Sequence, residues 1–491
     1  MSKALIGFVL LTAAGATAQA STYYVATNGN NANAGTSASP WKTIQYAADH
    51  VRAGDTVYIR GGAYKESVNI SVSGSAGNFI TFQSAPGETA VVDGTGLTVQ
   101  GQRGLININD KSYIKIVGLE IAKYSTSSTA NIPVGIWITG AGSYIQILNN
   151  HIHDIKNSAR GDAANALGLA VYGNNATSSI NNLTIDGNEI DHLTLGSSES
   201  LVVDGNVQYW SITNNVVHDN NNIAIDAIGY EGVSSSEATD QARDGVISGN
   251  TIYNISSYGN PAYGNEYAAD GIYCDGCTRV IIERNTIHHT DFGVEVASEW
   301  SGKRSTDVTV RSNLIYSNNA AGLTIGGYDS GRGGTERCNF VNNSFYNNDT
   351  KKTGAGEIQI QYYATNSAFK NNIVYASSEN LFIYDYTNSS AVDVDYNLYF
   401  SSGGAANSGW TWNEAEYQGF DNYRTASRQD AHSVFADPRY VSLTTPDLHV
   451  ATASPAVNAG TNLGSTIVGT LDRAGNARVQ GTNIDIGAYE Q

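Results

Sequence analysis

The feature that most constrains the fold of this chain is a repeated phrase, in which Asn is followed by one variable residue and then by an aliphatic or aromatic residue. The copies begin at Asn150, Asn188, Asn215, Asn250, Asn285, Asn313, Asn343, Asn372 and Asn397. Consecutive copies are 25 to 38 residues apart. A repeat of this length, with strand-like alternation and variable inserts, is typical of a solenoid of stacked coils. We expect these Asn residues to be structural, with a left-handed backbone and with each amide bonded to that of the next coil.

A second motif precedes most of these asparagines and has the form Gly, aliphatic, variable, aliphatic, variable. Its copies, some with another first residue, are Gly135–Thr139, Gly168–Tyr172, Ser200–Asp204, Asn222–Asp226, Gly271–Asp275, Gly293–Ala297, Gly322–Gly326, Glu357–Gln361 and Asn380–Tyr384. Because side chains alternate across a strand, the second and fourth positions face the interior, and the third and fifth face solvent. The two motifs predict two strands in each coil. Stacked coils of parallel strands predict an all-β, single-stranded right-handed parallel β-helix.

The N-terminal 20 residues have the pattern of a secretory signal peptide. One charge, Lys3, precedes an apolar stretch through Leu11, and the segment ends Ala18-Gln19-Ala20. We expect cleavage after Ala20 and secretion to the extracellular or periplasmic space. The apolar stretch is too short to span a bilayer.

The segments that flank the repeats are expected to close the ends of the solenoid. Residues 43–51 read as a short amphipathic helix that covers the open N-terminal end. Residues 454–460 and 485–490 fall outside the repeat and read as the opposite cap. The expected domains after the signal peptide are an N-terminal cap with the first coils (21–100), the parallel β-helix (101–400), and C-terminal coils with a cap (401–491).

The charge balance excludes several classes of partner. The chain has 27 basic and 45 acidic residues, a net charge of −18 that becomes −19 without Lys3. Such a surface repels nucleic acid and anionic membranes, so we expect neither of them as a partner. We expect the protein to be a monomer. Three cysteines are too few for a disulfide scaffold. Cys274 and Cys277 can be a redox pair or half of a zinc site, but no second ligand pair has suitable spacing, which favours buried small residues or one local disulfide.

Several segments resemble a known group of proteins. They are Tyr23-Tyr24-Val25-Ala26 with Asn28-Gly29-Asn30, the run from Gly54 to Tyr64, the Asn repeats, and the closing run from Asp485 to Glu490. Together they look like the pectate-lyase-like superfamily of secreted right-handed β-helices, over nearly the whole chain after residue 20. The resemblance implies a carbohydrate-active protein, because most characterised members cleave or epimerise polysaccharides. It does not select the reaction, since fold and function separate easily.

Acidic residues gather at the outward positions of the aligned strand motif. The fifth positions place Asp204, Asp226 and Asp275 in one column, and the third position adds Glu295. Stacked carboxylates repel, so such a column requires a shared proton, a metal or a basic partner. Loops at residues 229–241, 256–268, 298–305 and 326–332 flank the same coils and are expected to build a binding face.

Aromatic and acidic side chains near this column are candidates for sugar binding, because flat rings suit the apolar face of a pyranose and carboxylates suit its hydroxyls. The loops are expected to bring Tyr230, Tyr258, Tyr263, Tyr267, Trp300 and Tyr328 toward the acids. The predicted substrate-binding residues are Asp204, Tyr230, Glu266, Tyr273, Glu299, Trp300 and Tyr328.

A glycoside hydrolase needs one protonated and one ionised carboxyl group, and Asp226, Asp275 and Glu295 supply that inventory. We expect Asp275, crowded by acids above and below, to donate the proton, and Asp226 or Glu295 to act as base or nucleophile. This reading requires no cofactor. The chain lacks the Asn-Thr-Asp, Asp-Asp, Gly-His-Gly and Arg-Ile-Lys motifs of galacturonan hydrolases, so the resemblance does not point to pectin.

Two alternatives remain open from the sequence. A polysaccharide lyase would use a base among Lys303, Arg304, Arg243 and His288, with Ca²⁺ held by Asp204, Asp226 and Asp275. The calcium-dependent pectate lyases of this fold usually carry adjacent aspartates, and this chain has none. The other alternative is a non-catalytic, glycan-binding surface protein.

Overall fold

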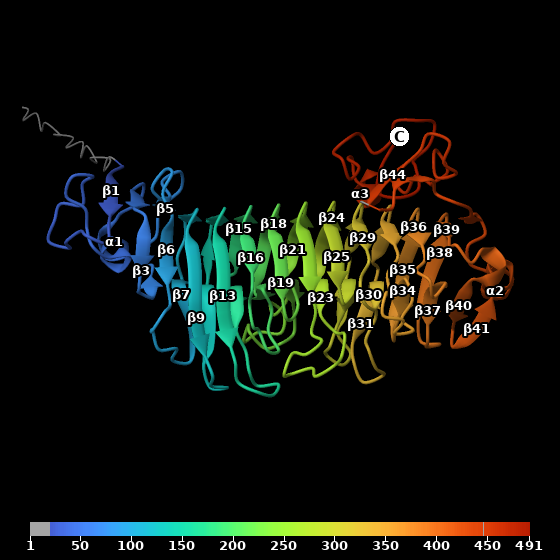
Figure 1. Ribbon diagram of the computed structural model, residues 1–491, viewed down its shortest axis with the longest axis horizontal. Coiled ribbons are helices and arrows are strands. Elements are labelled where there is room, and N and C mark those ends of the chain that lie inside the picture. The colour runs from blue at the N-terminus through green and yellow to red at the C-terminus, as the bar shows by residue number, and fades with distance from the viewer. Residues whose placement is uncertain (1–19, 445) are drawn as a thin grey trace, which may run out of the picture.

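The computed structural model describes residues 20–444 and 446–491, which form a long solenoid of parallel strands (Figure 1). The predicted signal peptide lies almost wholly outside the described residues. In each coil the chain visits three sheets in turn, here called sheets 1, 2 and 3, and each strand pairs in parallel with its counterpart in the next coil. The sequence motifs captured the strands of sheets 2 and 3, and the structure adds the third strand of each coil in sheet 1.

Sheet 1 has 16 strands: β1 (Thr22–Val25), β2 (Thr56–Ile59), β5 (Ile80–Ser84), β8 (Ile114–Val117), β11 (Gly142–Ser143), β12 (Ile145–Leu148), β15 (Ile180–Asp186), β18 (Val207–Thr213), β21 (Arg243–Ser248), β24 (Thr278–Glu283), β27 (Arg304–Thr306), β28 (Thr309–Arg311), β31 (Gly334–Glu336), β32 (Asn339–Val341), β35 (Ala364–Lys370) and β38 (Ala391–Asp395). Sheet 2 has 13 strands: β3 (Gly62–Tyr64), β6 (Ala90–Asp93), β9 (Glu120–Thr126), β13 (His151–Asn157), β16 (Glu189–Asp191), β19 (Val216–Asn220), β22 (Thr251–Ile255), β25 (Thr286–Thr290), β29 (Leu314–Tyr316), β33 (Ser344–Tyr346), β36 (Ile373–Tyr375), β39 (Leu398–Phe400) and β42 (Val434–Phe435).

Sheet 3 also has 13 strands: β4 (Val68–Asn69), β7 (Gln102–Asn109), β10 (Ile132–Thr139), β14 (Leu167–Gly173), β17 (Leu201–Gly205), β20 (Ile225–Ile228), β23 (Asp270–Asp275), β26 (Phe292–Ala297), β30 (Ala321–Ile325), β34 (Ile358–Ile360), β37 (Leu381–Asp385), β40 (Gly409–Trp412) and β41 (Ala415–Gln418). The remaining elements are the helices α1 (Ile44–His50), α2 (Phe420–Ser427) and α3 (Ser465–Val468), the 3₁₀ turn η1 (Ala405–Asn407), and the strand pair β43 (Tyr440–Ser442) and β44 (Asp447–Val450).

The interior of the solenoid is a continuous column of aliphatic side chains. Many strands of sheets 1 and 2 alternate buried and outward residues, as in β12, where Ile145 and Ile147 are buried and Gln146 is partly exposed. Burial of such aliphatic side chains contributes roughly 1.5 to 3 kcal/mol each. The alternating pattern of the sequence therefore correctly predicted an all-β right-handed parallel β-helix. No helix among the described residues is long and apolar enough to cross a membrane.

The repeated asparagines form a hydrogen-bonded ladder at the turn between sheets 1 and 2. In one step, the backbone N–H and the Nδ2 of Asn250 both donate to Oδ1 of Asn285 at 2.9 Å, and the Nδ2 also donates to the carbonyl of Ile212 at 3.0 Å. The predicted amide stacking is therefore confirmed. The left-handed residue is the one before each ladder Asn, with φ between 53° and 70°, so the prediction of a left-handed Asn is displaced by one residue.

The N-terminal end is closed by α1, as the sequence predicts. The Thr43 hydroxyl caps the helix by accepting a hydrogen bond from the backbone N–H of Tyr46 at 3.2 Å. Ile44, Ala47 and Ala48 enter the core on the inner side of the helix.

The C-terminal end is closed by the antiparallel hairpin of β40 and β41 together with α2. Trp410 and Tyr423 stack with ring centroids 4.3 Å apart, and Phe420 joins them in the core.

Residues 454–460 and 485–490, which the sequence assigned to this end, belong instead to a segment with α3 and β44 that lies along the side of the solenoid (Figure 1). We call residues 440–491 the C-terminal strap. It bonds to several coils: Arg473 donates to the Thr286 hydroxyl at 2.7 Å, Asn342 to the Asp485 carbonyl at 2.9 Å, and Asn371 to the Thr461 carbonyl at 2.8 Å.

Candidate active site

The predicted column of acids is instead a zigzag in the structure. Asp226 pairs with Val202 of β17 and with Tyr273 of β23, which places it at a third position of the motif rather than a fifth. Ile228 occupies the fifth position between Asp204 and Asp275. Asn222–Asp226 was therefore placed two residues out of register. The same shift affects the copy at residues 380–384, where Tyr384 pairs with Gln359.

Four consecutive strands of sheet 3 thus carry acids that alternate between two columns. Asp204 on β17 and Asp275 on β23 occupy the fifth position, and Asp226 on β20 and Glu295 on β26 occupy the third. Inter-strand spacing and strand rise place the Cα atoms of diagonal neighbours about 8 Å apart, compared with about 4.8 Å for a direct stack. The zigzag weakens the repulsion between carboxylates while it keeps them on one face of sheet 3. We call these four acids the acidic floor.

These acids are buried. The exposed fractions are 1% for Asp204, 2% for Asp226, 4% for Asp275 and 8% for Glu295. The Oδ1 atoms of Asp204 and Asp226 are enclosed and have no hydrogen-bond partner in the protein. A buried, unpaired carboxylate oxygen requires a proton, a water molecule, a cation or a ligand.

Asp226 lies where negative charge is most concentrated. Burial, followed by the carboxyl groups of Glu199, Asp275 and Asp270, raises the pKa of Asp226 well above its usual value. Burial and the carboxylates of Glu231 and Asp240 likewise raise the pKa of Asp204. A cluster of this kind retains protons near neutral pH.

Asp275 differs because a backbone donor supports its ionised form. Its Oδ1 accepts a hydrogen bond from the backbone N–H of Glu299 at 2.8 Å. Burial and the Glu299 carboxylate raise its pKa, while this hydrogen bond opposes them. The premise that Asp275 has acids directly above and below is wrong, because Ile228 and Ala297 occupy those positions.

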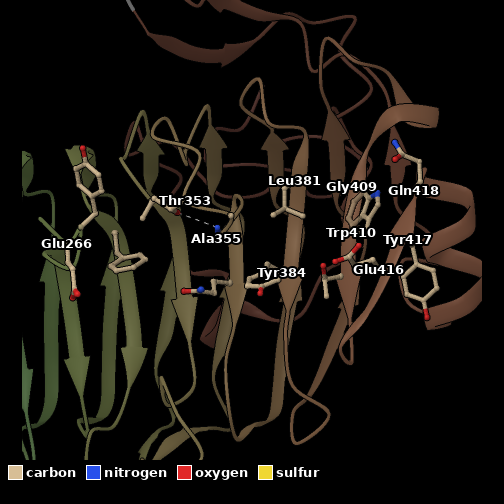
Figure 2. A pocket seen from close by; sticks show the side chains of 16 residues that line it. Glu266, Thr353, Ala355, Leu381, Tyr384, Gly409, Trp410, Glu416, Tyr417 and Gln418 are labelled. Atoms are coloured by element: carbon tan, nitrogen blue, oxygen red, sulfur yellow. Dashed lines mark hydrogen bonds between the residues drawn. The ribbon is translucent and has the colours of Figure 1, made fainter.

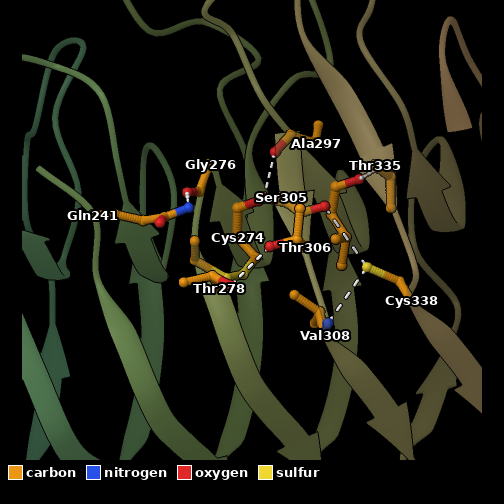
Figure 3. Close-up of a disulfide and its surroundings, with 12 residues drawn as sticks. Gln241, Cys274, Gly276, Thr278, Ala297, Ser305, Thr306, Val308, Thr335 and Cys338 are labelled. Carbon is orange, nitrogen blue, oxygen red and sulfur yellow. Dashed lines mark hydrogen bonds between the residues drawn. A yellow bond between two sulfur atoms is a disulfide. The ribbon is translucent and has the colours of Figure 1, made fainter. Parts of the chain in front are cut away.

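A disulfide brackets Asp275. Cys274 and Cys277 are bonded to each other, with Cα atoms 5.4 Å apart, and enclose Asp275 and Gly276 in a short loop (Figure 3). Figure 3 also shows Gln241 donating to the Gly276 carbonyl and Ser305 donating to the Ala297 carbonyl, at 2.7 Å and 2.6 Å. These contacts fix the backbone that carries Asp275. The local-disulfide reading of this Cys pair is the one that the structure contains.

Glu295 forms a carboxyl pair with Asp270, the first residue of β23. Burial raises the pKa of Glu295 to about 8, while its hydrogen bond to Asp270 acts in the opposite direction. Burial and the Glu295 carboxylate raise the pKa of Asp270 well above its usual value. Both shifts favour the protonated forms of this pair.

The sequence reasoning missed Glu199, Glu231 and Asp270. Glu199 and Asp270 each stand directly before the first residue of the strand motif, so a search of outward third and fifth positions could not find them. The two residues hold the same place before the motif in two coils, and Ile223 holds that place in the coil between them. This recurrence of an acid was the signal available in the sequence. Glu231 is an exposed loop residue next to Tyr230, in the insert at 229–241.

Loop and strand residues lie around the acidic floor. Among the predicted substrate-binding residues, Tyr273 is buried between Asp226 and Glu295 in the same column. Glu299 is exposed next to Asp275. Burial and the negative charges of Glu299 and Asp275 raise the pKa of Tyr328. Trp300 is 43% exposed beside Glu299.

Tyr263 also reaches the acids from the 256–268 loop. Burial and the negative charges of Glu199 and Glu299 raise the pKa of Tyr263 to about 12, although a hydrogen bond with Asn222 acts in the opposite direction. Tyr258 and Tyr267 instead stack on each other, with ring centroids 4.8 Å apart. Burial, Tyr258 and Asp291 raise the pKa of Tyr267, and the acids of sheet 3 are not among the causes.

The basic residues considered for a lyase are engaged elsewhere. Lys303 pairs with Glu237 and lies over the ring of Tyr230. Arg243 donates to Asn206 and Gln208, and Arg304 lies over Tyr363. His288 stacks between Tyr253 and Tyr316 on sheet 2, away from sheet 3, and burial lowers its pKa to about 4.

A groove of about 840 Å³ runs along sheet 3 toward the C-terminal coils (Figure 2). Figure 2 shows the predicted residue Glu266 at one end and Tyr417 at the other. Phe292, in the lining, lies on β26 with Glu295 and pairs with Asp270, so the groove begins beside the acidic cluster. From β26 to β40 it covers four coil steps, about 19 Å. Glu266 therefore belongs to the groove and not to the acidic floor.

Comparison with known proteins places the chain in a family. The family model described as Pel9A-like, right handed beta helix region, matches residues 23–183, and a second right handed beta helix model matches residues 203–351. The uncharacterized protein YwoF of Bacillus subtilis is 39% identical over 436 residues, covering 88% of this chain and 91% of that protein. The chain belongs to the pectate-lyase-like superfamily of right-handed β-helix proteins. This confirms the resemblance seen in the sequence.

One relative in this superfamily has a named activity. Pectate lyase PEL9 of Emericella nidulans is 29% identical over 167 residues, covering 31% of this chain and 39% of that protein.

Solved structures share the fold at low sequence identity. Pectate lyase Pel9A aligns with a TM-score of 0.53 at 14% identity, covering 96% of each chain. XylC in complex with xylose aligns with a TM-score of 0.52 at 14% identity, covering 95% of this chain and 98% of its own. The GH136 lacto-N-biosidase from Eubacterium ramulus aligns with a TM-score of 0.51 at 14% identity, covering 77% and 64%. These likenesses establish the fold alone.

Proposed function

We propose that this protein is a secreted carbohydrate-active enzyme that degrades a polysaccharide, with glycoside hydrolysis as the reaction. The observation that carries the proposal is the zigzag of buried carboxyl groups on sheet 3, next to the inserted loops. Burial and mutual repulsion raise the pKa of these carboxyl groups, which supplies the protonated acid that a glycosidase needs beside a second carboxyl group. The named relatives, a pectate lyase and a lacto-N-biosidase among them, add a carbohydrate-active context.

The environments assign different roles to the two central aspartates. Asp226, surrounded by Glu199, Asp270 and Asp275, holds a proton and donates it to the leaving oxygen. Asp275 accepts a hydrogen bond from the Glu299 backbone N–H, which favours its ionised form over that of Asp226, and we assign it the role of activating water or attacking the sugar. These roles reverse those expected from the sequence, because no carboxylate lies directly above or below Asp275. Glu295 and Asp270 form a further carboxyl pair beside them, and the pKa of each is raised.

The electrostatics favour a neutral glycan. The floor and walls carry Glu199, Asp204, Asp226, Glu231, Asp240, Asp270, Asp275, Glu295 and Glu299. The nearby cations Lys303 and Arg332 are paired with Glu237 and Asp329. A polyuronate would be repelled by this surface unless a cation intervened. The adjoining groove, with Tyr384 and Tyr417 in its lining, offers further sugar contacts along the solenoid axis.

A second candidate is calcium-dependent elimination on a uronate-containing glycan. It is favoured by the unpaired Oδ1 atoms of Asp204 and Asp226, which are hard oxygen donors of the kind that Ca²⁺ binds, and by the likeness to pectate lyases. Asp204, Asp226 and Asp275 would hold the ion, which would neutralise the substrate carboxylate. Against it, Lys303, Arg304 and Arg243 are engaged away from the floor.

One experiment separates the two reactions. The mature protein is incubated with neutral and acidic polysaccharides, with and without a chelator, and reducing ends and ultraviolet absorbance are followed together. Hydrolysis gives reducing ends without absorbance and persists in chelator. Reducing ends with absorbance, lost in chelator, would replace hydrolysis by elimination. No product across a broad panel, with glycan binding retained, would instead identify a binding protein.

A further inference from the structure

A second cluster of His, Asp and Glu side chains lies on sheet 2, away from the acidic floor of sheet 3. Three consecutive strands, β13, β16 and β19, bring together His151, Glu189, Asp191 and His218. Nε2 of His151 is 2.8 Å from Oδ2 of Asp191. One ligand atom from each of His151, Glu189 and Asp191 lies within 4.8 Å of the other two. Four groups of the types that bind transition metals therefore meet at one place on the surface.

His218 completes the cluster from the next coil. Its Nε2 is 3.3 Å from Oε1 of Glu189 and 3.7 Å from Oδ2 of Asp191. Its other ring nitrogen, Nδ1, is 2.6 Å from Oδ2 of Asp219. If Nδ1 carries the proton that this short contact requires, Nε2 points a lone pair at two carboxylates. A metal ion between them satisfies all three groups.

The contact between His218 and Asp219 has the form seen around metal-binding imidazoles. In such sites a carboxylate accepts the N–H of the non-ligating nitrogen, which fixes the tautomer and the ring orientation. The parallel ring of Tyr253, with its centroid 4.7 Å away, also holds the His218 ring in place. His218 and Asp191 are 10% and 7% exposed at the side chain, whereas His151 and Glu189 are 41% and 51% exposed. The cluster thus has a rigid base and an open side by which an ion can enter.

We propose that His151, Glu189, Asp191 and His218 bind a divalent transition-metal ion, with zinc as the best fit. Zinc takes imidazole nitrogen and carboxylate oxygen in a four-coordinate arrangement at about 2.0 to 2.2 Å. Two imidazoles select against calcium and magnesium, which prefer oxygen ligands throughout. This zinc site is separate from the alternative calcium site on the acidic floor, since it uses other residues on another sheet.

The ligands come from three successive coils, so the ion ties those coils together. Strand β16 leads through residues 192–200 into β17, which carries Asp204, and β19 leads through residues 221–224 into β20, which carries Asp226. A metal at this place stabilises the coils from which the acidic floor is built. Its role is structural, and it does not depend on the proposed reaction.

The test is metal titration of the full mature protein, without an affinity tag, after removal of metal by chelator and dialysis. Zinc binding is measured by calorimetry and by elemental analysis, and the melting temperature is followed with and without zinc. We expect one equivalent per chain and a zinc-dependent rise in melting temperature. The visible spectrum of the cobalt-loaded protein should show a four-coordinate site with nitrogen and oxygen ligands.

Variants locate the ion. His218→Asn and His151→Asn should each weaken zinc binding at least 10-fold, and Asp219→Asn should weaken it about 10-fold through the imidazole that it orients. The matched control is His432→Asn, because His432 is exposed and forms a similar contact with Asp395 at 2.7 Å but has no second histidine beside it. Because His151 is half-exposed, its variant tests the site even if His218→Asn fails to fold. Absence of stoichiometric binding, or equal affinity in His151→Asn and His432→Asn, would reduce the cluster to a network of ion pairs and overturn the proposal.

Discussion

Two rows of polar residues run along the solenoid and are built in opposite ways. The Asn ladder places one amide in direct register in each coil from Asn150 to Asn397, and the side chains within it donate to one neighbouring coil and accept from the other. The acidic floor of sheet 3 staggers its carboxyl groups between two columns, and several oxygens have no partner in the protein.

The difference follows from the chemistry of the two groups. An amide carries donors and an acceptor, so identical amides can be stacked at about 4.8 Å with every group satisfied. An ionised carboxylate is only an acceptor, so a direct stack would bury repelling charges. The ladder therefore stabilises the fold, whereas the acidic floor costs stability. The following predictions test this contrast, from the largest expected effect to the smallest.

The acidic floor should be necessary for activity and dispensable for folding. Asp275→Asn and Asp226→Asn should each lower the rate on the identified substrate by about 10²- to 10⁴-fold, the range of a lost acid or base. Both should melt at or above the wild-type temperature, because each replaces a buried carboxyl group, which is costly to ionise among other acids, by a neutral amide. Rates are compared with those of Asp244→Asn, an aspartate on sheet 1 that pairs with Arg279. Full activity in Asp275→Asn and Asp226→Asn would remove both residues from the mechanism.

The ladder should show the reverse behaviour. Asn285→Leu leaves the donors of Asn250 and the Ile247 carbonyl without their partner inside the turn. We expect a loss of about 3 kcal/mol in the free energy of unfolding, from several buried groups left unpaired. Denaturant unfolding measures it, with the exposed Asn388→Leu as the control. A loss below about 1 kcal/mol would mean that water replaces the ladder bonds.

The stagger itself can be tested at Ile228, which separates Asp204 from Asp275. Ile228→Asp would create the direct stack that the structure avoids, and Ile228→Asn has nearly the same shape without the charge. Both should lose the packing of Ile228, and the Asp variant should be less stable by about a further 1 to 2 kcal/mol at pH 8. The gap between the two should close at pH 4, where the new carboxyl group is protonated. Equal stability at pH 8 would show that repulsion does not shape this floor.

The acidic floor should also make stability depend on pH. Because Glu295 has a pKa of about 8 in the folded protein and an ordinary value when unfolded, the folded state binds more protons between these values. Stability should therefore be highest below about pH 4.5 as far as this group is concerned, and should fall as pH rises toward 8. Thermal scans should show a smaller decrease between pH 5 and pH 8 in Glu295→Gln than in the wild type, by a few degrees. An unchanged slope would mean that Glu295 titrates normally.

The sequence predicted the solenoid, the ladder and the strand face that carries the acids, because all three depend on alternation and spacing. It could not choose between registers two residues apart. In Asn222–Asp226, Ile223 and Ile225 both fit the buried positions, and a shift by two keeps every side chain on its own face. Only pairing with the neighbouring strands decides the register, and it moved Asp226 from one column to the other.

Two further parts of the molecule were beyond the reach of the motif. Asp270 and Glu199 stand just before the strand motif, where the sequence pattern gives no outward or inward assignment. The C-terminal strap has no repeat at all, so its place along the side of the solenoid follows only from contacts that span long stretches of chain, such as that of Asn342 with Asp485.

The C-terminal strap has a consequence for how the protein unfolds. In a simple solenoid each coil touches only its neighbours, so coils can fray one at a time from an end. Here Arg473 reaches back to Thr286 and Thr461 accepts from Asn371, so one segment bridges coils that do not touch each other. The coils from Thr286 to Asn371 should then open together, and their amides should exchange hydrogen with solvent as one cooperative unit. The strap therefore makes these coils unfold cooperatively rather than one after another.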